Sequence, residues 1–99
     1  MYKVIVTVRA KAQIDRGLLF WESINKDYTN RIAIEIDEIL NYVLVHHPYI
    51  GSNSDKKPGY KILYPGDGNF KLVYKIIEKD KLVKVTHFFS SRQKISNYI

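Results

Sequence analysis

The chain is 99 residues long, carries 16 Lys and Arg against 10 Asp and Glu for a net charge of +6, and contains no cysteine. This length fits one domain with a single modest core, so we expect residues 1–99 to form one domain. The missing cysteine excludes disulfides and thiolate-bound zinc, and the positive charge favours a polyanionic or acidic partner. No apolar run approaches a membrane span of roughly 20 residues or a signal-peptide core, which predicts a cytoplasmic protein without a membrane partner.

The first half of the chain predicts one strand followed by two helices. Residues 2–8 are rich in β-branched side chains, which is typical of a strand. A helix ending near Asn25, with a weak point at Gly17, is then indicated by an apolar stripe of Ala10, Ile14, Leu18, Trp21 and Ile24. A second helix, capped by Asp27 or Thr29 and closed by Pro48 and Gly51, has a stripe of Ile32, Ile36, Ile39, Leu40, Val43 and Leu44.

The second half predicts three strands. Residues 51–59 have loop composition and no apolar period. In the next segment Tyr60, Ile62 and Tyr64 alternate with Lys61 and Leu63, which predicts a strand, and the Pro-Gly-Asp-Gly sequence of residues 65–68 predicts the turn after it.

Residues 69–93 predict a hairpin with one lysine-rich face. If Lys79 and Asp80 form a two-residue turn, Lys75 lies opposite Lys84, and directly opposed like charges cost sheet stability. Lys71 shares this face, whereas the apolar face pairs Phe70 with Phe89, Leu72 with His87, Tyr74 with Val85 and Ile76 with Val83. The hydrophobic pattern selects this register or one shifted by two residues. The lysine-rich face is either a solvated strand surface or an anion-binding surface, and we weigh the two equally.

The predicted element order is therefore βααβββ. It describes an α+β fold in which a helical hairpin packs on one face of an antiparallel sheet, with the lysines on the opposite face.

Three further patterns have simpler explanations than a functional site. His46 and His47 lie at a predicted helix end and His87 on the core face, so we expect no metal site. The Gly-Asp-Gly sequence at 66–68 lacks the Lys-Ser/Thr of a phosphate loop, and we expect no cofactor. Acidic side chains predicted to be solvated on the second helix are Glu35, Asp37 and Glu38.

The element order and three segments carry a family resemblance. The segments are Tyr60-Lys61-Ile62, Phe70-Lys71-Leu72-Val73-Tyr74 and Phe88-Phe89-Ser90-Ser91-Arg92-Gln93. Over nearly the whole chain the sequence resembles the RelE/ParE superfamily of bacterial toxins. The resemblance implies the toxin half of a type II toxin–antitoxin module, with a cognate antitoxin that binds in extended or helical form across the helices and the basic face. RelE-like members cut messenger RNA in the ribosomal A site, whereas ParE-like members inhibit DNA gyrase and cut nothing.

A RelE-like activity implies roles for four residues. In that branch the ribose 2′-hydroxyl attacks the neighbouring phosphate, and basic side chains stabilise the charge of the transition state. By resemblance, Lys61 helps to activate the 2′-hydroxyl and Lys71 takes a position of arginine. Arg92 assists the leaving oxygen, and Tyr98 orients the substrate. Further lysines assigned to RNA binding are Lys56, Lys57, Lys75 and Lys84.

Two departures from the family pattern leave three functions open. Leu63 stands where efficient nucleases have a second basic residue, and Lys71 lacks the bidentate fork of arginine. The predicted function is a ribosome-dependent endoribonuclease with the ribosome and messenger RNA as partners. The alternatives are a ParE-like inhibitor of DNA gyrase and an inactive antitoxin-binding module. The nuclease requires Lys61, Lys71 and Arg92 to converge on one sheet face, whereas a plain four-residue loop after the first of these strands would place Lys61 on the core face.

Overall fold

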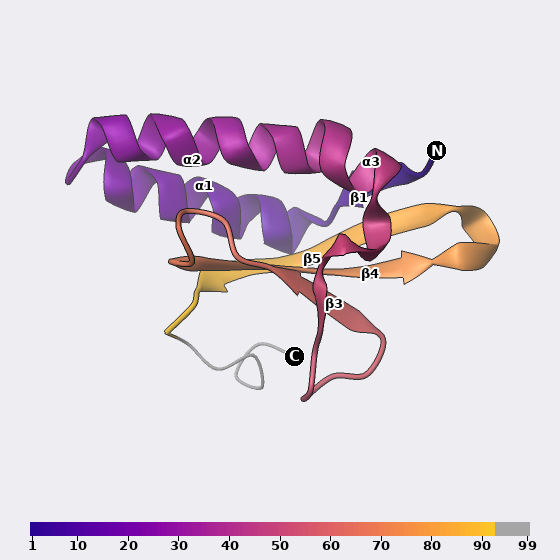
Figure 1. The fold of residues 1–99 in the computed structure, drawn as a ribbon. Helices are drawn as coiled ribbons and strands as arrows, with labels where there is room; N and C mark the ends of the chain where they lie inside the picture. Colours follow the sequence, from indigo (N-terminus) through magenta and orange to yellow (C-terminus); the bar gives the residue numbers. More distant parts are fainter. Residues whose placement is uncertain (93–99) are drawn as a thin grey trace.

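Two layers make up the computed structural model, which describes residues 1–92 (Figure 1). A helical hairpin of α1 (Val8–Glu22) and α2 (Lys26–Glu38) covers one face of the sheet. The sheet has five strands in the order β1-β5-β4-β3-β2, with bounds Lys3–Val6 for β1, Ser52–Asn53 for β2, Tyr60–Leu63 for β3, Phe70–Ile77 for β4 and Leu82–Ser90 for β5. The predicted α+β class and the helical hairpin on one sheet face are confirmed.

The sheet is mixed, in contrast to the purely antiparallel sheet that we predicted. β1 runs parallel to β5, from Lys3 opposite Leu82 to Val6 opposite Val85. The other neighbouring strands are antiparallel. Parallel neighbours need a long crossover connection, and the helical hairpin lies in the connection that leaves β1. The short edge strand β2 lies in the segment that composition predicted as loop.

Both helices begin at a side-chain cap. Thr7 accepts a hydrogen bond from the backbone N–H of Ala10, and Asn25 accepts one from Tyr28. Each bond satisfies an amide that has no partner within the helix. Asn25 therefore takes the place of the predicted caps Asp27 and Thr29, because α2 begins one residue after it.

The helical segment that follows α2 changes from α to π geometry, and its apolar side remains turned toward the sheet. A π-helical segment (η1, Ile39–Val43) leads into α3 (Leu44–His46) and a short 3₁₀ turn (η2, Pro48–Ile50). The wider π turn shifts the helical phase, and both Ile39 and Leu44 are buried. The predicted helix end before Pro48 is confirmed. No helix in residues 1–92 is long and apolar enough to cross a membrane.

Tyr74 fastens this helix exit to the sheet. Its side chain is fully buried, and its hydroxyl donates to the Pro48 carbonyl at 2.7 Å and accepts from the Gly51 N–H at 2.9 Å. A Cβ at Gly51 would lie 2.6 Å from that hydroxyl oxygen, so the close approach requires glycine. Burial raises the pKa of Tyr74, which keeps the hydroxyl protonated and able to donate.

The hairpin of β4 and β5 follows the predicted register only near its turn. Lys75 lies opposite Lys84 and Tyr74 opposite Val85, as predicted, but a β-bulge then places Val73 opposite His87. The turn is also different from the predicted two-residue turn. It is a 3₁₀ turn (η3, Glu78–Asp80) closed by Lys81, whose φ is 49°.

The bulge exchanges the faces of the last residues of β5. Phe88 joins the main core between helices and sheet, where its ring stacks on Phe70 at a centroid distance of 4.8 Å. Phe89 joins a smaller cluster on the other sheet face with Ile62 and Val73. The predicted pairings of Phe89 with Phe70 and of His87 with Leu72 on the core face are therefore wrong. One extra residue in a strand moves every following side chain to the opposite face.

Candidate nucleic-acid interface

Three lysines project from the sheet face that the helices leave uncovered. Lys71 and Lys75 alternate along β4 with core residues, and Lys84 lies between the core residues Val83 and Val85 of β5. Successive side chains of a strand point to opposite faces, so all three lysines share one face. We call this the lysine face.

Aromatic rings support two of these lysines. The Lys75 Nζ lies 5.6 Å from the centroid of the Tyr60 ring, and the Lys71 Nζ lies 6.0 Å from that of Phe89. Such contacts attract the ammonium group to the ring while the alkyl stem covers apolar surface. The lysine face is therefore a set of cations on a rigid apolar support.

Lys75 and Lys84 lie directly opposite one another across the β4–β5 ladder. Neither forms an ion pair within residues 1–92, where the ion pair present joins Lys81 to Glu78. Opposed like charges destabilise a sheet, and a bound anion between them would relieve the repulsion. This arrangement favours a negatively charged ligand.

Lys61 is not brought together with Lys71. It lies opposite Tyr74 on the helix-side face of β3, where its Nζ donates to the Gly51 carbonyl at 3.2 Å and to Asn53 Oδ1 at 2.9 Å. The amide of Phe70 donates to the Pro65 carbonyl and closes a plain loop over residues 66–69. Lys61 therefore lies on the core face, and the convergence required by the nuclease hypothesis is not found for this residue.

Lys56 and Lys57 occupy the loop between β2 and β3. The Lys57 amide donates to Ser54 Oγ at 3.1 Å, and its carbonyl accepts from the Tyr60 amide. The loop thus leads into the end of β3 at which Tyr60 pairs with Lys75. Lys56 is exposed and Lys57 is half-buried in this loop.

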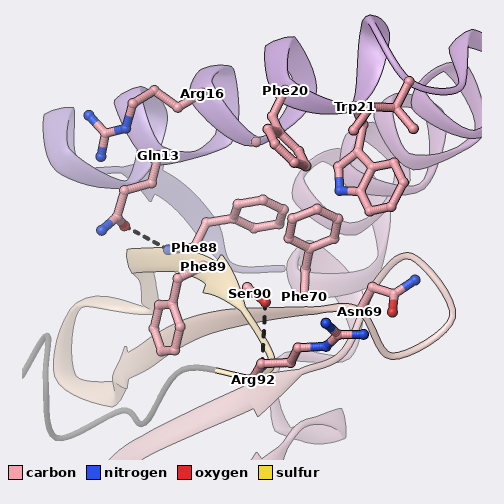
Figure 2. A pocket seen from close by; sticks show the side chains of 12 residues that line it. Gln13, Arg16, Phe20, Trp21, Asn69, Phe70, Phe88, Phe89, Ser90 and Arg92 are labelled. Atoms are coloured by element: carbon pink, nitrogen blue, oxygen red, sulfur yellow. Dashed lines mark hydrogen bonds between the residues drawn. The ribbon is translucent and has the colours of Figure 1, made fainter.

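Arg92 lies at the other end of β5, beside a groove of about 640 Å³ between α1 and the sheet. The stacked pair Phe70 and Phe88 lies between Phe20 and Trp21 of α1 on one side and Arg92 on the other (Figure 2). Arg16 of α1 also lines this aromatic groove. Both arginines are exposed. Tyr98, which by resemblance would orient the substrate, lies outside the described residues.

Gly17 allows the stacked phenylalanines to approach α1. A Cβ at this position would lie 3.2 Å from Phe88 and 3.4 Å from Phe70. The glycine that weakens the helix in the sequence therefore permits the aromatic groove in the structure.

His87 lies on the side of the sheet opposite to its predicted position. Its Nε2 is 3.3 Å from Arg9 Nη1, and its Nδ1 is 3.0 Å from Thr86 Oγ1. A guanidinium can only donate, so His87 Nε2 is the acceptor in the contact with Arg9. No group of three or more His, Cys, Asp or Glu side chains in residues 1–92 is placed to hold a metal ion.

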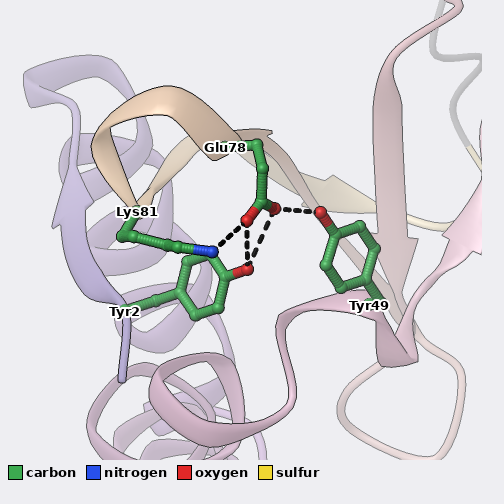
Figure 3. Close-up of polar contacts among 4 residues, drawn as sticks. All are labelled: Tyr2, Tyr49, Glu78 and Lys81. Atoms are coloured by element: carbon green, nitrogen blue, oxygen red, sulfur yellow. Dashed lines mark hydrogen bonds and ion pairs between the residues drawn. The ribbon is translucent and has the colours of Figure 1, made fainter.

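Glu78 gathers three donors at the far end of the hairpin (Figure 3). Tyr2 donates to both carboxylate oxygens, at 2.8 and 2.9 Å, and Tyr49 and Lys81 also donate to Glu78. Hydrogen bonds from Lys81, Tyr49 and Tyr2 lower the pKa of Glu78 to about 2. The bond to Glu78 raises the pKa of Tyr49 to about 12. This cluster was not predictable from the sequence, because Tyr2, Tyr49 and Glu78 are far apart in the chain.

A second missed cluster holds the loop beside the aromatic groove. Glu35, predicted to be solvated, accepts from the Gly66 amide at 2.8 Å. Tyr28 donates to the Gly66 carbonyl at 2.8 Å and accepts from Asn69 Nδ2 at 2.7 Å. These contacts were not predictable from the apolar stripe of α2, because they join the helix to a loop about 30 to 40 residues further along the chain.

The two-layer fold is similar to that of chains in solved ParDE and RelBE toxin–antitoxin systems and of an isolated RelE toxin. A chain in the chromosomal ParDE system of P. aeruginosa superposes with a TM-score of 0.66 and 12% identity, over 91% of this chain and 96% of that chain. A chain in the RelBE2 toxin–antitoxin complex of Mycobacterium tuberculosis gives 0.64 and 15%, over 90% and 96%. The isolated RelE toxin of E. coli gives 0.56 and 16%, over 98% and 92%.

These similarities establish the fold at low sequence identity. No protein-family model matches the chain, and no curated protein sequence matches it. Similarity of fold at this identity does not by itself assign an activity.

Proposed function

We propose that this protein is the toxin of a type II toxin–antitoxin module and that its lysine face binds messenger RNA on the ribosome. The observation that carries the proposal is the opposed pair of Lys75 and Lys84, without ion-pair partners in residues 1–92, on a fold shared with the E. coli RelE toxin. A phosphate backbone supplies the negative charge that this face requires. A cognate antitoxin is the second partner.

The chemistry proposed is cleavage of RNA by its own 2′-hydroxyl. The 2′-hydroxyl gives up its proton to solvent as its oxygen forms a bond to the neighbouring phosphorus, the bond from phosphorus to the 5′-oxygen breaks, and a 2′,3′-cyclic phosphate remains. The leaving 5′-oxygen takes up a proton. Lys71 and Arg92 belong to the same end of the β4–β5 ladder and would stabilise the charge on the phosphate oxygens and the leaving oxygen. Lys61 acts as a structural residue in this scheme, since its Nζ is bonded to Gly51 and Asn53.

A second candidate function is inhibition of DNA gyrase without chemistry. It is favoured by the position of Lys61 on the core face and by the packing of Leu63 against the main core. These two positions would contribute no basic group to a phosphate on the lysine face. In this case the lysines would serve as a docking surface.

Primer extension on a defined messenger in a purified translation system separates the two functions. We expect cuts within the A-site codon only when ribosomes are present. Removing one group that stabilises the transition state typically costs a factor of roughly 10²–10³, so Arg92→Ala and Lys71→Ala should cut at least that much more slowly. Lys79→Ala removes the same charge as Lys71→Ala from the exposed turn η3 and should cut at the native rate.

Lys61→Ala provides a further control in the same assay. We expect it to retain cleavage and to lower the melting temperature, because it removes two hydrogen bonds that hold the helix exit. A complete loss of cutting in folded Lys61→Ala would contradict our placement of the site. Absence of cuts by the native protein, with loss of gyrase supercoiling activity on addition of the protein, would establish the second function.

A further inference from the structure

We propose that Arg9 is a further RNA-binding residue of the lysine face and that His87 positions it. In this arrangement Arg9 holds the phosphate of the messenger that neighbours the one that is cut. The inference rests on the proposed function and adds to it one contact and one positioning residue. No pattern in the sequence indicated either role.

Arg9 reaches the sheet edge from the helix layer. It lies in the first turn of α1, and its Nη1 is 3.3 Å from Nε2 of His87 on β5. β1 ends at Val6, opposite Val85, so Arg9 lies beside the part of β5 that continues beyond the β1 pairing. The Arg9 side chain is exposed. A guanidinium is thus present at this edge in addition to the lysines.

His87 fixes the place of this guanidinium. The β-bulge puts His87 opposite Val73, whose side chain lies on the lysine face. The His87 ring is 5% exposed, and its Nδ1 lies 3.0 Å from Thr86 Oγ1 while its Nε2 accepts from Arg9. A buried ring held at both nitrogens has one orientation. It therefore orients Arg9 before a ligand arrives, which lowers the entropy that binding costs.

The charge around Arg9 favours an anion. The first turn of α1 contains no acidic side chain, and the positive end of the helix dipole disfavours a cation there. Arg9 forms no ion pair within residues 1–92. His87 engages one N–H donor of the guanidinium, and the other donors can form a bidentate pair with a phosphate. A bound phosphate would therefore offset the unfavourable charge at this helix end.

Arg9 and Lys71 occupy successive positions along β5. Arg9 contacts His87, whereas Lys71 lies opposite Phe89, whose ring supports its ammonium group. His87 and Phe89 are two residues apart in an extended strand, which corresponds to roughly 6.6 Å. Arg92 follows just after the end of β5. An RNA strand laid along β5 therefore meets Arg9 before it reaches Lys71 and Arg92, the pair proposed to act on the cut phosphate.

The first test measures binding of the protein to ribosomes by co-sedimentation. The messenger carries a 2′-deoxynucleotide at the cut position, so it cannot be cleaved. Arg9→Ala should bind roughly three- to tenfold more weakly at physiological salt, and the slope of log affinity against log salt should fall by about 0.7, the value for one phosphate contact with a single strand. Lys11→Ala removes an exposed charge from the same helix on a side that does not face Arg9, and it should bind like the native protein.

Ribosomes whose messenger ends at the P-site codon identify the source of the phosphate. They present ribosomal RNA without messenger in the A site, so the native protein and Arg9→Ala should bind them equally. Weaker binding of Arg9→Ala to these ribosomes would assign the contact to ribosomal RNA and overturn the proposal.

A double-mutant cycle tests the positioning role of His87. His87→Leu removes the acceptor and should weaken binding as Arg9→Ala does, whereas His87→Gln provides a side-chain oxygen as acceptor and should retain most of the affinity. Combined with Arg9→Ala, His87→Leu should cause no further loss, because a residue that acts only through Arg9 then has nothing to position. Additive losses would overturn this role. Arg9→Ala changes an exposed side chain, so its test does not depend on the folding of His87→Leu.

Cleavage assays separate this inference from the proposed function. On a cleavable messenger, Arg9→Ala should require more protein for half-maximal cutting but should reach the native maximal rate, because Arg9 does not contact the cut phosphate. If Arg9→Ala binds like the native protein, keeps the native salt slope or cuts at a lower maximal rate, the inference is overturned and RNA cleavage stands. A native protein that cuts no messenger and binds both kinds of ribosome equally would overturn the proposed function as well.

Discussion

Single side chains join segments of this protein that are distant in the sequence. Tyr74 of β4 connects the helix exit at Pro48 and Gly51 to the sheet. Glu78 joins the turn η3 to Tyr2 at the start of the chain and to Tyr49. Neither residue lies on the lysine face or in the aromatic groove, so their effects on stability can be measured without changing the proposed site.

Tyr74→Phe should destabilise the fold. The substitution leaves the Pro48 carbonyl and the Gly51 amide without the partner that Tyr74 provides in a buried position, which costs about 1–3 kcal/mol. For a domain of this size, 1 kcal/mol corresponds to roughly 4–8 °C in melting temperature. Tyr64→Phe removes the hydroxyl of a tyrosine that is 47% exposed and should change the melting temperature little. Equal melting temperatures for the two variants would show that the Tyr74 hydroxyl contributes nothing.

Glu78→Gln should lower the melting temperature at pH 7 and should make the melting temperature less dependent on pH in the acid range. The pKa of Glu78 is about 2 in the folded protein against an ordinary value of 4.5. The ionised carboxylate therefore stabilises the fold fully above about pH 4.5, and this contribution is lost as the pH falls through about 2. Thermal melts from pH 7 to pH 2 should show a difference between native protein and variant that shrinks with the pH.

Asp80→Asn in the same turn is the control for this measurement. Asp80 is exposed and makes no ion pair within residues 1–92. Its variant should follow the native curve. A difference between native protein and Glu78→Gln that stays constant down to pH 2 would contradict the assigned pKa.

One irregularity decides the faces of the last residues of β5. Up to Val85 it follows the plain hairpin register, and the bulge then places Phe88 against Phe70 and α1, where it forms the aromatic groove. Thr86 is the residue without a ladder partner. The same bulge sends Phe89 to the lysine face, where it supports Lys71. Both candidate surfaces thus depend on this one extra residue.

Deletion of Thr86 should be tolerated better than deletion of Lys84. Without Thr86 the remaining residues alternate in a plain hairpin that keeps Val85 and Phe88 in the core. The free energy of unfolding then falls only because the hydrogen bonds of Thr86 with Val73 and Thr7 are lost, by about 1–3 kcal/mol in all. Without Lys84 either Val83 or Val85 must leave the core. Exposing that side chain alone lowers the free energy of unfolding by a further amount of about 1.5–3 kcal/mol. Urea unfolding gives both values, and equal losses would show that the bulge does not set the faces.

Across the molecule, the two sheet faces have separate tasks. The helix-side face holds the main core, and the opposite face carries the lysines over a small apolar cluster. The aromatic groove lies between α1 and the ends of β4 and β5, and Arg92 is among the residues that line it. In the function that we propose, the lysine face presents positive charge to RNA on the side of the sheet that the helices leave uncovered.

Much of the fold was predictable because its signals are local. The 3.6-residue period predicted both helices, and Pro48 indicated where the second one ends. Alternation within residues 60–64 and within residues 70–77 predicted two of the strands. The register of β4 and β5 next to their turn was also predictable, from the pattern of lysines and apolar residues. The parallel pairing of β1 with β5 was not predictable from these signals, since it depends on how the helical hairpin returns the chain to the sheet.

Which residues alternate along a strand can be read from the sequence, but the side of the sheet toward which each one points is set by tertiary packing. Alternation within β3 and β5 is a local property, but the face of each residue depends on the parity of the loop at 66–69 and on the bulge at Thr86. A change of one residue in either place costs little locally and exchanges the two faces. Tertiary contacts select one of the two arrangements. Phe88 packs against Phe70 and Gly17, and Lys61 donates a hydrogen bond to the Gly51 carbonyl. The lysine face was therefore visible in the sequence, whereas the position of Lys61 and the aromatic groove were not.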